Sequence, residues 1–401
     1  MHDPLSTRSV HGDGGEPHPY GALAFPIVQT STFTFRDTAA VREFMRRKAA
    51  RDPELRDEYA RYSNPTTRAA EHTLAALEGG EQALLFTSGM AAITTTLLSL
   101  LSSGDHLVVL ECCYRRTADF VRNFLPRWGV GATFAPVDRP EAWSEAVRRT
   151  TRVLFAETPS NPYLRVADLD RLAGLARDCG ARTLVDSTFA TPVNLRPLSH
   201  GVDLVVHSAT KYLAGHNDLL AGAVIGRRDL LEPVAEARGV LGGVVGPHDA
   251  WLLRRGLKTL DLRVRRQNET GLRLARFLET QPAVRKVWYP GLESHPDHAA
   301  AGQLLEGCGG VVSFEIDGDL EATGRFVDAL QIPFIGPTLG GVESIVQQPA
   351  LFVSLDPAER RASGLADNLV RYAAGLEDAD DLEADLAQAL EVLERRGRRQ
   401  P

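Results

Sequence analysis

The feature that most limits the fold is a regular alternation of short apolar runs and helical patterns from residue 68 to about 226. The apolar runs predict strands at 83–86, 106–110, 153–156, 183–185 and 204–206. Helical patterns occupy 69–77, 90–101, 117–125 and 169–179. Continuously apolar strands that alternate with helices are typical of a mostly parallel sheet covered on both faces. The sequence therefore predicts an α/β fold for this part of the chain.

The last third of the chain has a different pattern. One long helical pattern covers 257–281, and a strand, a helix and a closing helix are expected at 310–316, 320–330 and 378–396. This pattern indicates a smaller α+β domain that joins the large sheet near residue 257.

The N-terminal part lacks both patterns. Residues 1–40 mix proline, glycine, serine and threonine with little helical period, so we expect an extended arm. Such an arm either crosses onto a neighbouring subunit or is a frayed terminus. The densely charged stretch 39–59 predicts one or two exposed helices. We expect an arm over 1–58 that contacts a neighbouring subunit, a large cofactor-binding domain over 59–256 and a small domain over 257–401.

Charge and cysteine usage exclude several classes of protein. Lysine plus arginine number 45 against 52 acidic residues, and this net charge of −7 argues against non-specific binding to nucleic acid or membranes. No apolar run approaches the roughly 20 residues of a membrane helix. The start of the chain lacks the pattern of a secretory signal, and none of the 4 cysteines forms a C-x-x-C pair. We therefore expect a cytoplasmic protein without a metal site, and a structural turn at His295 and His298.

The densest chemical signal is DLVVHSATKYLAGHNDLLAG, residues 203–222. A buried strand ends here, and Ser208, Thr210 and Lys211 follow within four positions. Burying an unpaired ammonium is costly, so a lysine in this place favours a lowered pKa and can form a Schiff base. The two hydroxyls could hold a phosphate. The alternative is a surface loop with an incidental lysine.

Two further segments fit the same chemistry. Asp186 ends a strand 25 residues before Lys211, at the sheet edge where open α/β proteins bind ligands. An aspartate there could pair with a pyridinium nitrogen and make the ring an electron sink, or it could simply cap a turn. The run FTSGM, residues 86–90, leads from a strand into a helix whose N-terminus could cradle a phosphate.

Four other side chains are candidates with weaker individual signals. Tyr59 and Arg61 precede a turn in YARYSNPTT, and an arginine fork suits phosphate. Tyr114 follows the strand at 106–110 and could stack on a flat cofactor. Asn161 lies near a strand end in ETPSNP. Each of these residues, taken alone, fits an ordinary structural role equally well.

Together these motifs resemble the pyridoxal-phosphate enzymes of cysteine and methionine metabolism, the trans-sulfuration family. The resemblance extends over nearly the whole chain and includes PIVQTSTF (26–33), LEGGEQALLFTSGM (77–90), RGLKTLDLR (255–263), YPGLESHPDH (289–298) and TLGGVESI (338–345). CYRRT (113–117), GHNDLLAG (215–222) and VESIVQQPA (342–350) look most like the plant-type cystathionine γ-synthases. The resemblance implies fold type I of these transferases and a homotetramer in which pairs of subunits share active sites.

The resemblance also implies a role for each candidate residue. Lys211 would bind the cofactor as a Schiff base and move protons, and Tyr114 and Tyr59 would assist in catalysis. The implied cofactor contacts are Tyr59, Arg61, Gly89, Met90, Tyr114, Asn161, Asp186, Ser208, Thr210 and Lys211. The implied substrate contacts are Arg371, Thr338, Asn161 and Arg116. In these roles Asp186 pairs with the ring nitrogen, Arg371 binds the substrate carboxylate, and Tyr59 and Arg61 come from the neighbouring subunit.

The implied reaction is a γ-replacement. An O-phospho-, O-succinyl- or O-acetylhomoserine would lose its γ-substituent through a vinylglycine-type intermediate, and a thiol such as cysteine would add to give cystathionine. The alternatives are an enzyme of specialised metabolism that uses another γ-activated amino acid such as S-adenosylmethionine, and a cystathionine or methionine γ-lyase. A non-catalytic relative is disfavoured because Lys211, Asp186 and Arg371 are intact.

Three departures from the family pattern concern the substrate pocket. Thr338 replaces a common serine, Pro337 a common glutamate, and Ala373 another serine. Arg115 and Arg116 bear on the leaving group, because a cationic pair could accept an anionic γ-substituent. The alternative for that pair is a solvated helix start.

Overall fold

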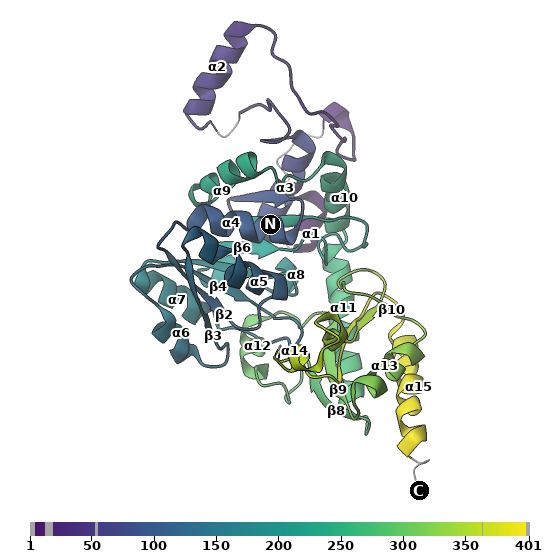
Figure 1. The fold of residues 1–401 in the computed structure, drawn as a ribbon. Coiled ribbons are helices and arrows are strands. Elements are labelled where there is room, and N and C mark those ends of the chain that lie inside the picture. Colours follow the sequence, from purple (N-terminus) through teal and green to yellow (C-terminus); the bar gives the residue numbers. More distant parts are fainter. Residues whose placement is uncertain (1–4, 13–18, 53–54, 363, 398–401) are drawn as a thin grey trace.

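A seven-stranded sheet forms the centre of the molecule in the computed structural model, which describes residues 5–12, 19–52, 55–362 and 364–397 (Figure 1). The strand order is β1-β7-β6-β5-β4-β2-β3, and β7 alone among these strands runs antiparallel to its neighbours. The strands are β1 (Gln82–Phe86), β2 (His106–Leu110), β3 (Gly131–Ala135), β4 (Thr151–Glu157), β5 (Arg182–Asp186), β6 (Leu204–His207) and β7 (Gly222–Gly226). The expected mostly parallel sheet is confirmed, although the sequence analysis did not identify β3 and β7.

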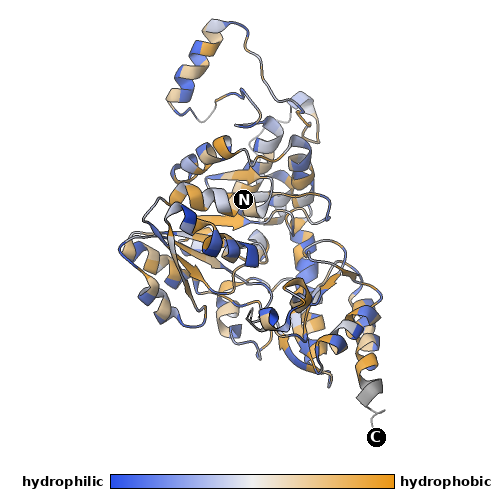
Figure 2. Cartoon of the chain, viewed as in Figure 1, coloured by the Kyte–Doolittle hydropathy of each residue, from blue (hydrophilic) through white to orange (hydrophobic). Residues whose placement is uncertain are grey.

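Helices cover both faces of this sheet because successive strand residues point to opposite sides. Val153 and Phe155 pack on one face, against α4 (Gly89–Leu100), α5 (Arg115–Asn123) and α9 (Arg228–Leu241). Leu154 and Ala156 pack on the other face, against α6 (Pro140–Ala146) and α7 (Leu169–Cys179). In Figure 2 the strands of this sheet are apolar. Two-sided burial explains why these strands are continuously apolar.

Among the described residues, four further helices pack around the large sheet or connect it to the last third of the chain. These are α3 (Pro65–Glu78), α8 (Thr191–Asn194), α10 (Pro247–Leu257) and α11 (Leu260–Glu279). Short 3₁₀ segments lie at Pro19–Gly21, Leu125–Trp128, Pro197–His200 and Pro349–Phe352. The helix expected at 257–281 is α11, which begins at Leu260 after a two-residue break from α10.

A second, five-stranded sheet forms the last third, in the order β10-β11-β12-β9-β8. Its strands are β8 (Val284–Trp288), β9 (Val311–Ile316), β10 (Phe334–Ile335), β11 (Ile345–Gln347) and β12 (Leu369–Ala373). The accompanying helices are α12 (His298–Leu304), α13 (Leu320–Ala329), α14 (Pro357–Ala362) and α15 (Ala379–Gly397). Most of its strand pairs are antiparallel, which agrees with the expected α+β character. The domain boundaries at 58/59 and 256/257 stay a prediction.

The N-terminal arm is not extended throughout, which corrects the sequence-based expectation. Leu5–His11 forms helix α1, which packs on α3 and α11, with Leu5 against the main apolar core. The local pattern is weak because the helix is only 7 residues long and depends on tertiary contacts. Residues 1–4 and 13–18 of the expected arm lie outside the described residues.

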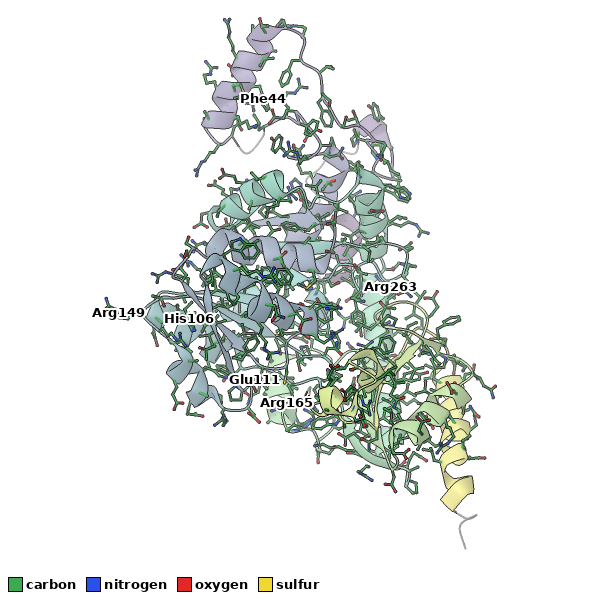
Figure 3. All side chains as sticks on the ribbon, viewed as in Figure 1. Phe44, His106, Glu111, Arg149, Arg165 and Arg263 are labelled. Carbon is green, nitrogen blue, oxygen red and sulfur yellow. The ribbon has the colours of Figure 1, made fainter. Side chains whose placement is uncertain are left out.

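Helix α2 (Thr38–Ala49) projects from the body, as expected for an exposed helix (Figure 1). Asp37 caps it by accepting from Ala40 N at 2.8 Å. Phe44, labelled in Figure 3, is its buried residue, and its ring centroid lies 5.2 Å from that of Phe35.

The sequence predicts neither a membrane helix nor a metal site. No helix among the described residues is both long and apolar enough to span a membrane. Within the same residues, His, Cys, Asp and Glu form no cluster suited to a metal ion. His295 lies in a turn, where Nε2 faces Tyr163 O at 3.2 Å and Nδ1 accepts from Asp297 N at 3.1 Å. The expected turn does not extend to His298, which is the first residue of α12.

Candidate active site

Lys211 lies in the turn that follows strand β6. Lys211 N donates to Ser208 O at 3.1 Å, and Lys211 O accepts from Gly215 N at 2.8 Å, so local hydrogen bonds hold the backbone. Its Nζ donates to Thr338 Oγ1 at 2.8 Å. Burial, and then the charge of Arg371, lowers the pKa of Lys211 to about 8. A larger fraction of this amine than of an ordinary lysine is therefore neutral and nucleophilic near neutral pH.

Asp186 ends strand β5 and is buried. Thr188 donates to its Oδ1 from N at 3.0 Å and from Oγ1 at 2.5 Å, and Thr188 Oγ1 accepts from Ser208 N at 2.8 Å. Burial raises the pKa of Asp186, although the Thr188 bonds oppose this shift. Both bonds end on Oδ1, so among the described residues Oδ2 is left for another donor.

Arg371 joins the second sheet to the Lys211 turn. It lies on β12, and its side chain donates to Asn161 Oδ1 at 3.1 Å and to Thr338 O at 2.9 Å. Its Nε is buried without a hydrogen-bond partner among the described residues, and burial lowers the pKa of Arg371 to about 10. A buried guanidinium that lacks a carboxylate partner is suited to bind an anionic group.

An anion cradle lies beside this cluster, at the N-terminus of α4. Ser88 caps the helix by accepting from Ala91 N at 3.1 Å, while the N–H groups of Gly89 and Met90 have no acceptor in the described part of the chain. A Cβ on Gly89 would lie 2.9 Å from Ser208 Cβ, and one on Gly222 would lie 2.1 Å from Ser88 O. The backbone segments at Gly89 and Gly222 therefore pack closely enough against their neighbours to surround a small anion.

Thr210 fits this cradle less well than expected. Its Oγ1 donates to Ala221 O at 3.2 Å and accepts from Ala221 N at 3.0 Å. The hydroxyl is therefore already engaged with the backbone, whereas Ser208 Oγ has no such bond in the described residues. The role of Thr210 stays a prediction.

Tyr114 and Arg116 lie at the start of α5, on the rim of the cluster. Tyr114 N donates to Glu157 Oε2 at 2.5 Å, and the Tyr114 residue is 43% exposed. Arg116 Nη1 lies 3.1 Å from Asp119 Oδ2, and its side chain is exposed. The structure gives Arg116 no contact with Lys211 or Arg371, so its substrate role stays a prediction.

Tyr59 and Arg61 are not brought to Lys211 within one chain. Tyr59 pairs with Thr32 in an antiparallel bridge, and Ala60 N donates to Ser31 O at 2.9 Å. Arg61 donates to Gly239 O in α9. Their implied cofactor contacts can therefore arise only with another subunit, and they remain predictions.

The sequence analysis missed two side chains of the cluster, Glu157 and Thr188. Glu157 ends strand β4 and is paired in register with Asp186 on the neighbouring strand β5. An acidic residue at the end of each of two adjacent buried strands is the signal that was available, because both side chains then point to one face. That face is the one covered by α4 and α5.

Comparisons with known proteins agree with this geometry. The family model described as "Cys/Met metabolism PLP-dependent enzyme" matches residues 6–391. Cystathionine gamma-synthase 1, chloroplastic, of Nicotiana tabacum is 46% identical over 93% of this chain and 68% of its own length. An L-methionine gamma-lyase of Fusobacterium nucleatum is 40% identical over 97% of this chain and 98% of its own length. The crystal structure of metB from Corynebacterium glutamicum superposes with a TM-score of 0.89 at 34% identity, covering 98% of this chain and 99% of that one.

Proposed function

The chain belongs to the Cys/Met metabolism PLP-dependent enzymes, and we propose that it catalyses a γ-replacement on an activated homoserine, with a thiol such as cysteine as the incoming group. The observation that carries this proposal is the buried guanidinium of Arg371, which is suited to bind an amino-acid carboxylate. Thr338 links it to Lys211, because Thr338 O accepts from Arg371 and Thr338 Oγ1 accepts from Lys211 Nζ. The greater identity to the tobacco synthase than to the Fusobacterium lyase supports synthesis over elimination.

The described residues fit pyridoxal phosphate, the cofactor of this family. Asp186 Oδ2 is available for a ring N–H, and the N–H groups of Gly89 and Met90 with Ser208 Oγ are available for the phosphate. The partly neutral amine of Lys211 suits an aldehyde carbon. We propose that Tyr114 stacks on the ring.

When bound, the cofactor supplies an electron sink that acidifies the α-proton of an amino acid joined to it. The residues of the chain then have separable tasks. Asp186 keeps a negative charge opposite the ring nitrogen, and Arg371 orients the substrate by its carboxylate. Lys211 can accept a proton at Nζ because burial favours its neutral form, and the Thr338 hydroxyl orients that nitrogen.

The pH dependence of cofactor attachment follows from Lys211. A lowered pKa means that the neutral amine predominates above pH 8, whereas an ordinary lysine amine predominates only above about pH 10.4. We expect the rate of attachment to cofactor-free protein to rise from pH 6, to reach half of its maximum near pH 8, and to level off above that pH. Stopped-flow absorbance would measure it. A rate that still climbs tenfold per pH unit above pH 9 would contradict the burial argument.

A product assay tests the reaction itself. The protein is incubated with O-phospho-, O-succinyl- and O-acetylhomoserine, each with and without cysteine, and the products are identified by mass. We expect cystathionine, formed only when cysteine is present. Equal release of a 2-oxo acid and ammonia with and without cysteine would instead establish a γ-lyase, the second candidate, which the 40% identical Fusobacterium enzyme favours. If none of the three homoserine esters reacts, the γ-replacement proposal fails.

We also propose an oligomeric state and a cellular location for the protein. A homotetramer of active-site-sharing dimers is supported by Tyr59 and Arg61, which lack contact with Lys211 in their own chain. A cytoplasmic location is supported by the absence of disulfides, since Cys112, Cys113, Cys179 and Cys308 are all free.

A further inference from the structure

Glu157 is a buried acid without a task in the proposed reaction, in which Lys211 transfers the proton and Arg371 binds the substrate carboxylate. Its Oε2 accepts from Tyr114 N at 2.5 Å, and its Oε1 accepts from Asn161 N at 3.1 Å. One carboxyl therefore joins the loop after β2 to the loop after β4. These loops carry the expected ring-stacking side chain and the partner of Arg371.

The bonds continue from Glu157 towards Lys211. The Asn161 side chain accepts from Arg371 at 3.1 Å, and Arg371 donates to Thr338 O at 2.9 Å. The Thr338 hydroxyl in turn accepts from Lys211 at 2.8 Å. Glu157 thus stands at the start of a chain of contacts that ends at the reactive amine.

This placement is electrostatically unfavourable. Glu157 is in register with Asp186, and burial and then the neighbouring Asp186 raise the pKa of Glu157 well above its ordinary value. An apolar side chain of similar volume would avoid the cost of burying a second carboxyl. The two backbone N–H groups that the carboxyl satisfies offset part of this cost.

Glu157 also holds the backbone at the residue that precedes α5. Tyr114 precedes α5 and supplies no side-chain cap to it, and Glu157 is the acceptor for its backbone N–H. Without that acceptor, nothing in the described residues holds this N–H at the strand end, so the position of the phenol is less restricted.

We propose that Glu157 is a positioning residue of the cofactor site, whose two carboxyl oxygens hold the backbones of Tyr114 and Asn161 beside Asp186. The proposal concerns binding of pyridoxal phosphate and is independent of which amino acid the enzyme uses. Failure of the substrate assay would therefore leave it intact.

The substitution Glu157→Gln tests this role without changing volume. The amide replaces one acceptor oxygen by an NH₂ donor, which then faces a backbone N–H. We expect faster backbone hydrogen exchange in peptides containing Tyr114 or Asn161, measured by mass spectrometry on cofactor-free protein. We also expect about a tenfold or greater rise in the Kd of pyridoxal phosphate and a changed visible circular dichroism of the bound cofactor.

The matched control is Asp203→Asn at the opposite edge of the same sheet. Asp203 Oδ2 accepts from Thr183 N at 2.9 Å and its Oδ1 accepts from Arg182 Nη1 at 3.0 Å, so the same acid-to-amide change removes one of two engaged acceptors away from the site. We expect a change in stability there but an unchanged Kd and dichroism. Unchanged exchange at Tyr114 and Asn161 in Glu157→Gln, or equal effects of both variants on the Kd, would overturn the proposal.

A second variant covers the case in which Glu157→Gln does not fold. Glu157→Asp keeps the carboxyl group but is one methylene shorter, so it can reach only one of the two N–H groups. We expect faster exchange at one of the two loops and a smaller rise in the Kd. Protection of both loops equal to that of the unchanged protein would again contradict the positioning role.

Discussion

Lys211→Ala is expected to abolish covalent retention of pyridoxal phosphate and to lower turnover by at least about 10²–10⁴-fold, the usual contribution of a positioned proton-transfer group. In the proposed mechanism the Lys211 amine is the nucleophile; burial lowers its pKa, and its hydrogen bond to Thr338 links it to the Arg371 side of the site. Alanine removes both the attachment point and the proton carrier.

Borohydride reduction followed by intact-mass measurement gives a direct readout of attachment. The unchanged protein should gain the mass of one reduced cofactor, and Lys211→Ala should gain none. Lys258→Ala is the matched control, because Lys258 caps the C-terminus of α10 and has no hydrogen bond to Lys211, Asp186 or Arg371 in the described residues, and it should retain the full mass gain. Labelling of Lys211→Ala to the same extent as the control would show that another amine is the attachment site.

Asp186→Asn is expected to lower kcat by about 10²–10³-fold, a loss comparable to that of a preorganised electrostatic group at a reacting centre. Asparagine can still accept both Thr188 bonds through its amide oxygen, so the strand end should keep its geometry. What is lost is the negative charge on the other oxygen, which in the proposed mechanism would keep the ring nitrogen of pyridoxal phosphate protonated and the ring electron-poor.

Steady-state kinetics at saturating cofactor measure this effect. We expect the loss mainly in kcat, with a smaller change in KM, because the substrate carboxylate still meets Arg371. Asp203→Asn provides the same chemical change at the far edge of the sheet and should leave kcat within about twofold. A kcat for Asp186→Asn within about threefold of the unchanged enzyme would remove Asp186 from the mechanism.

Sequence reasoning succeeded where the signal is local. The strand at His106–Leu110 and the helix at Leu169–Cys179 match the expected ranges, because a buried strand or an amphipathic helix is recorded in neighbouring residues. The location of Lys211 and Asp186 at strand ends followed from the same local patterns together with the rule that parallel strands end at one edge.

Reasoning failed where long-range packing decides the structure. Helix α1 forms against α3 and α11, which its own sequence does not reveal. The bond from Tyr114 N to Glu157 likewise joins two loops that are far apart in the sequence, so no local pattern records it. The motif ETPSNP drew attention to Asn161, while the residue with two backbone partners was the glutamate that opens it.

By itself the sequence determined the α/β class, five of the seven strands of the large sheet, and the type of chemistry, because apolar periodicity and a lysine after a core strand are properties of short segments. Only the tertiary structure decided that Arg371, 160 residues beyond Lys211 in the chain, shares Thr338 with it, and that Glu157 lies beside Asp186. The physical reason is that strand order and register bring residues together across distances along the chain that no local pattern encodes.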